Sequence, residues 1–339
     1  MDVLDLRQPI VRILFRGVDI TDATSSEWIS TTVTDNLEGH ADEVQIEFRN
    51  NHGRWFDAWF PELNDKMQVF LGYKGGRLLD AGTFFLDQPN AQGARSGDTF
   101  SLRGQSKPVN QALKTKKTRG FEKQSQKQIA QKVLSDAGLG MIGNPPDVLF
   151  ERNTQRREFD LEYLARLASD FGCFFAVKGG NAIYANRDDL FAQQPVTTLT
   201  KGDRAIIRYH LKHDAEGTYS KAKASYFDGN TKKNIEVEVE DGQVKTGDTK
   251  RTDDRVESKA QADKMVRSKL QKANMKAWTG DFELVGDPTL QAGVTLGLAG
   301  YGRWNRKYII QRARHQWTRR SATTNIEIAD ARASQSGGK

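Results

Sequence analysis

Residues 156–187 read RREFDLEYLARLASDFGCFFAVKGGNAIYANR and combine a short amphipathic helix with a hairpin. Apolar residues recur at helical spacing after Asp160, which is a good N-cap, and Gly172 ends the pattern. Two apolar runs, CFFAV and AIYA, then flank Gly179 and Gly180, which predicts a β-hairpin. The stretch contains no nucleophile motif, metal-ligand set or phosphate loop, so we interpret this small α+β unit as scaffold.

A second helix is predicted upstream in SQKQIAQKVLSDAGLG, residues 125–140. Ser125 and Gln128 fit a capping box, and Gly138 stands at the C-terminal stop. The two helices and the hairpin define an α+β domain over residues 106–194.

The regions on both sides of this domain are predicted to be β. Residues 10–105 contain five apolar runs between turn signals: PIVRILFRG, EVQIEFRN, KMQVFLGY, GTFFLD and DTFSLRG. Residues 195–339 contain more, among them RAIIRYHLK, SKAKASYFD, GVTLGLAG, KYIIQRARHQW and TTNIEIADA. Short strands at this spacing favour a sandwich or a barrel. Two insertions are expected in the second region, a two-stranded arm over 235–250 and a helix over 258–275.

Two β segments share a spacing of apolar residues. A Pro-x-Leu at 61–63 and a Pro-x-Leu at 288–290 are each followed by three alternating apolar residues, with an offset of 227 throughout. These residues are Met67, Val69 and Leu71 in the first segment and Val294, Leu296 and Leu298 in the second. We therefore expect the two β regions to be related domains.

Chemistry is sought in three kinds of residue cluster. His210 and His213 lie in a run that alternates like a strand, which would point them to opposite faces, and we expect no metal site. The acidic pairs 188–189 and 253–254 could serve a glycosidase, but paired acids are commonly solvated turns. No GxSxG, Walker A or dinucleotide motif is present. We predict a protein without enzymatic activity and without a cofactor.

The composition leaves one alternative open. The formal net charge is +7, which is compatible with nucleic acid or an acidic partner surface, although basic clusters such as KTKKTR stand among acids. The single cysteine, Cys173, excludes disulfides within the chain. No apolar run approaches the roughly 20 residues of a membrane helix, and no signal peptide is evident.

The loop NNHGRWFDAWFPELND, residues 50–65, crowds four aromatic side chains between two strands. Trp55, Phe56, Trp59 and Phe60 could form a plug over one end of a barrel or an aromatic anchor at a protein interface. We take these four residues as the candidate interface site.

The pair EKQSQKQIAQKVLSDAGL and RREFDLEYLARLASDFGCFFAVKGGNAIYAN resembles the central region of phage late control protein D. That family is the baseplate hub of contractile tails, and the same pair is similar to the N-terminal half of the VgrG spike of type VI secretion. The segment GDPTLQAGVTLGLAGYGRWNRKYIIQRARHQWTRRSATTNIEI also resembles late control protein D, through the glycine turn at 300–302, the Tyr-x-Ile strand at 308–310 and His315.

The resemblance implies a homotrimeric ring in which each subunit contributes two β-barrels like the tail-tube protein. Six barrels would match the sixfold tube, and the threefold symmetry would match the spike. VgrG continues into an OB-like domain and a β-helical needle that this sequence lacks, so a separate central spike protein is expected. The tail tube, tape measure and baseplate wedge proteins are the other implied partners. The implied location is the tail baseplate of a virion or tail-like particle assembled in the host bacterial cytoplasm.

The sequence therefore predicts a mainly β protein with an α+β insert, in which two tail-tube-like β-barrels flank a small helix-hairpin domain. The expected domains are a first barrel over 1–105, the α+β bracket over 106–194 and a second barrel over 195–339. The predicted function is a structural baseplate hub joining tube to spike. A nucleic-acid-binding tail protein and a cell-wall hydrolase of the tail tip are the alternatives.

Overall fold

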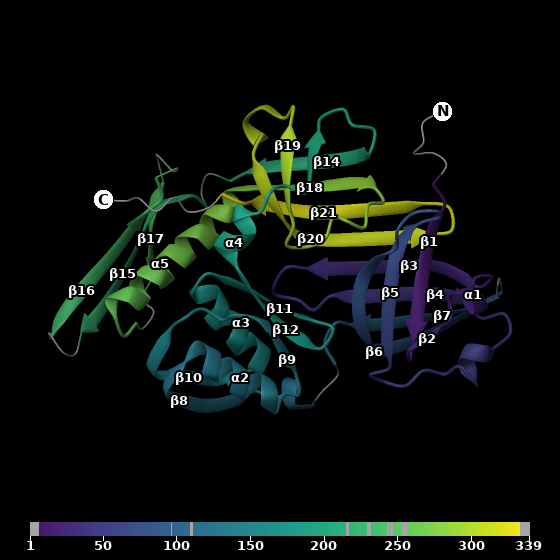
Figure 1. Cartoon of the computed structure of the whole chain (residues 1–339), viewed down its shortest axis with the longest axis horizontal. Coiled ribbons are helices and arrows are strands. Elements are labelled where there is room, and N and C mark those ends of the chain that lie inside the picture. The colour runs from purple at the N-terminus through teal and green to yellow at the C-terminus, as the bar shows by residue number, and fades with distance from the viewer. Residues whose placement is uncertain are drawn as a thin grey trace.

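The structure is a computed structural model, shown in Figure 1. It describes residues 7–332 except residues 96, 109–110, 215–216, 229–231, 243, 245–246 and 253–255. The protein is mainly β, with a large sheet, an α+β bracket below it and an arm on one side (Figure 1). Within this described part, no helix is both long and apolar enough to cross a membrane.

A 13-stranded sheet unites the N-terminal and C-terminal parts of the chain. Its N-terminal strands are β1 (Pro9–Phe15), β2 (Val18–Asp19), β3 (Trp28–Asn36), β4 (Glu43–Arg49), β5 (Lys66–Tyr73), β6 (Leu79–Ala94) and β7 (Gly97–Gln105). Its C-terminal strands are β13 (Thr197–Thr200), β14 (Ile206–His213), β18 (Trp278–Val285), β19 (Thr295–Ala299), β20 (Lys307–Thr318) and β21 (Ala322–Asp330).

The two halves of this sheet repeat one strand order. The N-terminal half runs β1-β5-β6-β7-β4-β3, and the C-terminal half runs β13-β19-β20-β21-β18-β14. Numbered along the chain within each half, both are 1-4-5-6-3-2. The halves differ in one pairing, because β1 is antiparallel to β5 whereas β13 is parallel to β19. Each half has its own apolar core.

Irregularities in the ladders correspond as well. The β3–β4 register shifts between Trp28 and Ser30, and the β14–β18 register shifts between Ile206 and Arg208, 178 residues later. The β6–β7 register shifts between Leu86 and Gln88, and the β20–β21 register shifts between Ile310 and Arg312, 224 residues later. Because a bulge marks one position in a strand, these matches fix which residues correspond.

The offset of 227 read from the sequence is wrong by two residues, although β5 and β19 do correspond in strand order. Leu86 exchanges backbone hydrogen bonds with Asn64 and Asp65, as Ile310 does with Gly293 and Val294. Asn64 and Gly293 both have positive φ, 69° and 91°. The structural offset is therefore 229. Alternation with a period of two does not reveal a slip of two residues, since the same face stays buried.

The bracket contains the predicted helices, α2 (Gln126–Asp136) and α3 (Asp160–Asp170), and the predicted hairpin, β11 (Cys173–Lys178) and β12 (Asn181–Asn186). Ser125 and Gln128 form the predicted capping box. Three strands were not predicted: β9 (Gly140–Gly143), which adds in parallel to β12, and the pair β8 (Lys117–Ser125) and β10 (Leu149–Glu158). The helices and both small sheets share one apolar core.

Asp160 is not the N-cap of α3, because Phe159 occupies that position with extended backbone. The Asp160 carboxylate is fully buried and lies 2.6 Å from Lys117 Nζ and 2.6 Å from Arg119 Nη2 on β8. Gln155 Nε2 on β10 also donates to it, at 2.9 Å. The side chain therefore ties α3 to the β8–β10 pair.

The arm differs from the expected two-stranded structure, which was wrong. β15 (Tyr219–Asp228) is the central strand of a three-stranded sheet, between β16 (Lys233–Glu240) and β17 (Asp248–Thr252). It does not join the large sheet, because Ala222 and Ala224 on one face pack against α5 (Lys259–Asn274). Small side chains at alternate positions let the helix approach the strand closely.

The remaining helices are short. They are α1 (Thr21–Thr24), α4 (Arg187–Ala192) and the 3-10 turns Arg54–Phe56, Gln111–Lys114, Met275–Ala277 and Gly302–Trp304.

Candidate assembly interface

The aromatic loop separates into a buried part and an exposed part. Trp55 is fully buried and stacks between Phe48 and Phe100, with ring centroids 4.9 Å and 5.4 Å away. Trp59 packs against Trp55 in an edge-to-face arrangement at 5.3 Å. Trp55 therefore belongs to the core of the N-terminal half, and its place in the predicted interface is not supported by its position.

Phe56 and Phe60 are the exposed members of the same loop, at 51% and 53%. Among the ring contacts of the described residues, each makes one, an edge-to-face contact with Phe100, at 6.3 Å and 6.5 Å. Large apolar side chains that stay half exposed are candidates for covering by a partner. The interface prediction for this loop thus stays a prediction, and it now rests on Phe56 and Phe60.

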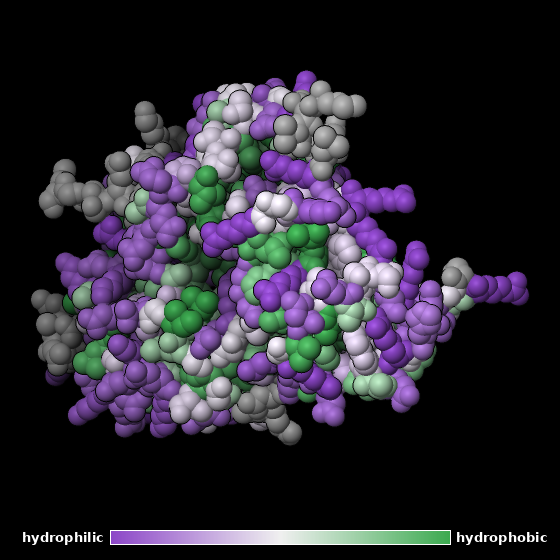
Figure 2. Space-filling view, turned by 45° about the vertical axis from the view of Figure 1, so that its right-hand side comes forward, coloured by the Kyte–Doolittle hydropathy of each residue, from purple (hydrophilic) through white to green (hydrophobic). Residues whose placement is uncertain are grey.

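Two of the strand edges that have no partner within the described chain belong to β14 and to the outer half of β6. β14 ends the sheet, and its residues Ile207 and Tyr209 are 54% and 42% exposed. The outer half of β6, residues 88–94, pairs only with β7, because the β5 ladder stops at Phe85. Unpaired strand edges are templates for pairing with another chain. Figure 2 shows one face of the molecule, where hydrophobic side chains gather near the middle among hydrophilic ones.

The histidine pair lies on β14, as predicted. His213 stacks on Trp278 at 3.8 Å, and His210 Nδ1 faces the Asp281 carboxylate at 3.7 Å. Nowhere in the part of the chain that the structure describes do three or more His, Cys, Asp or Glu side chains gather as metal ligands.

One of the two acidic pairs, Asp188 and Asp189, lies in the first turn of α4. The backbone N–H groups of Asp188 and Asp189 donate to Asn186 Oδ1 at the start of α4, which places this pair in an ordinary helix cap. The pair at 253–254 lies outside the described residues.

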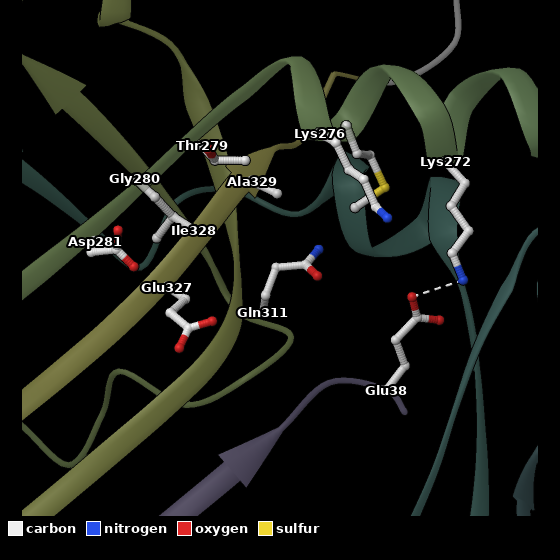
Figure 3. A pocket seen from close by; sticks show the side chains of 11 residues that line it. Glu38, Lys272, Lys276, Thr279, Gly280, Asp281, Gln311, Glu327, Ile328 and Ala329 are labelled. Atoms are coloured by element: carbon white, nitrogen blue, oxygen red, sulfur yellow. Dashed lines mark ion pairs between the residues drawn. The ribbon is translucent and has the colours of Figure 1, made fainter. Parts of the chain in front are cut away.

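A cavity of about 290 Å³ lies where α5 meets the large sheet (Figure 3). Its walls carry charges of both signs, including Asp281, Glu327 and Lys276, and Lys272 Nζ is paired with Glu38 at 2.9 Å. The lining contains carboxylates and lysines but no histidine, cysteine or serine. We interpret it as a polar crevice at the junction of arm and sheet.

A buried ion cluster joins the bracket to both halves of the sheet. Lys178, at the end of β11, is paired with Asp35 on β3 and, at 3.1 Å, with Asp42. The Asp35 carboxylate also accepts a hydrogen bond from the backbone N–H of Ala292, which precedes β19. Burial raises the pKa of Asp42 to about 6 against the attraction of Lys178. The cluster fixes the relative position of three parts of the chain.

Comparison with known proteins identifies the family. The model of the family described as phage tail baseplate hub (GPD) matches residues 81–321, which is more than two thirds of the chain. The chain belongs to the phage tail baseplate hub family. Sequence relatives include a probable baseplate hub protein of Escherichia phage 186, 24% identical over 201 residues that make up 58% of this chain and 50% of that protein. The chain thus spans about half the length of the curated relatives it matches.

Solved structures share the fold of this hub-family chain. The 43 kDa tail protein of prophage MuSo2 from Shewanella oneidensis aligns with a TM-score of 0.72 and 16% identity, covering 95% of this chain and 98% of that one. An Escherichia coli component of the type VI secretion system aligns with a TM-score of 0.58 and 12% identity, covering 89% and 73%. The predicted resemblance to hub proteins and to type VI secretion is confirmed.

The free edges of this hub-family chain were missed in the sequence. The strand predicted from the run GTFFLD is shorter than β6, because residues 88–94 lack apolar alternation and contain Pro89. Proline within a sheet is nearly confined to edge strands, so Pro89 was the available signal.

Proposed function

We propose that this chain is a structural hub subunit of a phage tail or phage-tail-like contractile particle, a homotrimeric adaptor between the sixfold tail tube and the threefold central spike. The observation that supports it is the repeat of strand order 1-4-5-6-3-2 in the two halves of the sheet. Three chains would present six similar β units in one ring, which suits a sixfold partner on one side and a threefold partner on the other.

The partners of this proposal are a second and third copy of the chain, the tail tube protein and a separate spike protein. The expected location is the baseplate of the particle, after assembly in the host cytoplasm. The relatives that match are described as baseplate hub proteins, and we propose no catalytic activity for this chain.

The nucleic-acid alternative has less support. Basic residues of the KTKKTR segment contact side chains of the bracket, since Lys117 and Arg119 pair with Asp160 and Lys116 lies 5.2 Å over the Phe159 ring. A surface that binds nucleic acid would instead leave these basic side chains free to contact phosphates.

Light scattering on the purified chain, followed by mixing with tube protein, tests the proposal. We expect a mass of three chains and a stable complex with a ring of the tube protein. A monomer at every concentration, or a trimer that ignores the tube protein, would contradict it. Peptidoglycan clearing that a single carboxylate substitution abolishes would favour the hydrolase alternative.

A further inference from the structure

We propose that the free edge of β14 pairs with the outer half of β6 in a neighbouring copy of this chain, in the antiparallel register of the β3–β20 contact. The inference rests on the proposed trimer and specifies which strands, and which residues, join its subunits.

The template is the contact that joins the two halves within one chain. The first part of β20 pairs with β19, as far as Ile309. Its second part, from Arg312 to Thr318, pairs with β3, from Asn36 back to Ser30. β20 also contacts β1, and Trp317 Nε1, near the end of β20, donates to the Gly72 carbonyl on β5 at 3.2 Å. One long strand therefore belongs to both halves.

The repeat assigns this same role to a second pair of strands. The matched bulges make β14 the counterpart of β3 and β6 the counterpart of β20. In β6 the first part pairs with β5, as β20 pairs with β19, and residues 88–94 correspond to residues 312–318. Within the described chain, β14 and this part of β6 are the counterparts that lack a partner.

The register follows from the two offsets. Adding 178 to β3 positions and subtracting 224 from β20 positions converts each internal pair into an intersubunit pair. Trp317 opposite Thr31 becomes Gly93 opposite Tyr209, and His315 opposite Val33 becomes Ala91 opposite Leu211. The remaining pairs are Gln88–Asp214, Pro89–His213, Asn90–Lys212, Gln92–His210 and Ala94–Arg208.

Side-chain sizes agree with this register. In the internal contact the large residue is on β20: Trp317 is fully buried and lies opposite the small Thr31. In the inferred contact the large residue is on β14: Tyr209 would lie opposite Gly93. Tyr209 already stacks on Phe282 at 5.8 Å and meets the Tyr301 ring edge-on at 5.1 Å, yet stays 42% exposed. A neighbouring strand with no side chain at this point would cover it without a clash.

Pro89 is compatible with a strand edge, because the backbone donor that it lacks would point away from β7. In the inferred register Pro89 lies opposite His213 at a hydrogen-bonded position, so this contact has one backbone hydrogen bond fewer than the β3–β20 contact. Because β14 and β6 are different edges, the contact is head-to-tail, and it closes a ring only if the rotation permits. Under the proposed function the ring closes after three chains, so that it contains six halves of the sheet.

Disulfide trapping tests the register. The Leu37 N–H donates to the Gln311 carbonyl at 2.9 Å, so these two residues form a hydrogen-bonded pair of the β3–β20 ladder. Hydrogen-bonded and non-hydrogen-bonded pairs alternate along an antiparallel ladder, which makes Gln316–Thr32 a non-hydrogen-bonded pair. Its counterpart, Gln92–His210, would bring the two Cα atoms to about 4.5 Å, within disulfide reach. The matched control, Gln92→Cys with Lys212→Cys, is displaced by two residues, which places its Cα atoms roughly 7–8 Å apart. Native Cys173 is buried and common to both variants.

We expect Gln92→Cys with His210→Cys to give covalently linked chains under mild oxidation and the control variant to give few. A trimer by light scattering that crosslinks no better in the first variant than in the control would overturn the register and leave the proposed function standing. A chain that stays monomeric would instead remove the proposed function, and with it this inference.

A size swap gives an independent test. Gly93→Trp alone should weaken trimer association about tenfold to a hundredfold, because Trp would collide with Tyr209. Adding Tyr209→Thr recreates the Trp317–Thr31 pair and should restore association. Both positions are exposed in the single chain, so monomer unfolding reports any folding defect separately. Failure of the second substitution to rescue a folded first variant would contradict the inferred pair.

Discussion

Replacing Trp55 by alanine should destabilise the N-terminal half of the sheet by about 4 kcal/mol. Trp55 is fully buried and contacts three rings, those of Phe48, Phe100 and Trp59, at 4.9–5.4 Å. Truncating a buried Trp to Ala typically costs about 3–5 kcal/mol, and the stacked rings place this site in the middle of that range or above. Within the aromatic loop, Trp55 is therefore the side chain that fills the core of the N-terminal half.

Hydrogen exchange of peptides that cover β4 and β7 measures this effect locally, which suits a chain with several cores. A loss of about 4 kcal/mol would speed exchange by roughly a thousandfold when opening is the limiting equilibrium. Two controls sharpen the result. Trp55→Phe keeps an aromatic ring in the stack; it gives up part of the indole ring and an N–H that has no hydrogen-bond partner among the described residues, so it should cost clearly less than Trp55→Ala. Phe60→Ala, at a half-exposed ring, should change exchange little. Equal effects of Trp55→Ala and Phe60→Ala would refute the division of the loop into plug and surface.

Three further predictions concern other parts of the chain. Asp160→Ala should destabilise the bracket by about 3 kcal/mol in urea unfolding, because it removes a fully buried carboxylate that accepts from Lys117, Arg119 and Gln155. Asp136→Ala, at a half-exposed pair, should cost under about 1 kcal/mol, and similar losses in the two variants would contradict this. Burial lowers the pKa of His315 to about 4 in the folded chain. Between about pH 6.5 and 4 the unfolded chain therefore binds a proton at His315 and the folded chain does not, so the free energy of unfolding falls as the pH falls through this window. Wild type should therefore lose up to about 3 kcal/mol more than His315→Gln over that range, and parallel pH profiles would be the adverse result. Phe56→Ser with Phe60→Ser should leave unfolding nearly unchanged and weaken assembly measured by light scattering; a lowered melting temperature with unchanged assembly would count against an interface there.

The sequence predicted helix ends and strand positions correctly where residues close together in the chain determine the backbone structure. Ser125 and Gln128 marked the start of α2, and Gly172 marked the end of α3, where its φ of 87° lies in the left-handed region that favours glycine. Apolar alternation located most strands of the large sheet. These features are set by neighbours along the chain, so they are readable without the fold.

Other features depend on partners far along the chain. β8 and β10 are rich in charges and polar residues, and they form strands because they pair with each other and with buried groups such as Asp160. The sequence of β15 does not distinguish it from a strand of the large sheet; its separate place follows from the packing of Ala222 against α5. The candidate interface depends on the fold in the same way: the burial of Trp55 and the edges of β6 and β14 became visible only when the strand order was known.

A cryo-EM map of the purified ring would test the central claim most directly. We predict threefold symmetry with six similar β units around one axis, alternating between β3–β20 seams within chains and β14–β6 seams between chains. A ring with a different number of chains, or halves of the sheet that do not superpose strand for strand, would contradict the account.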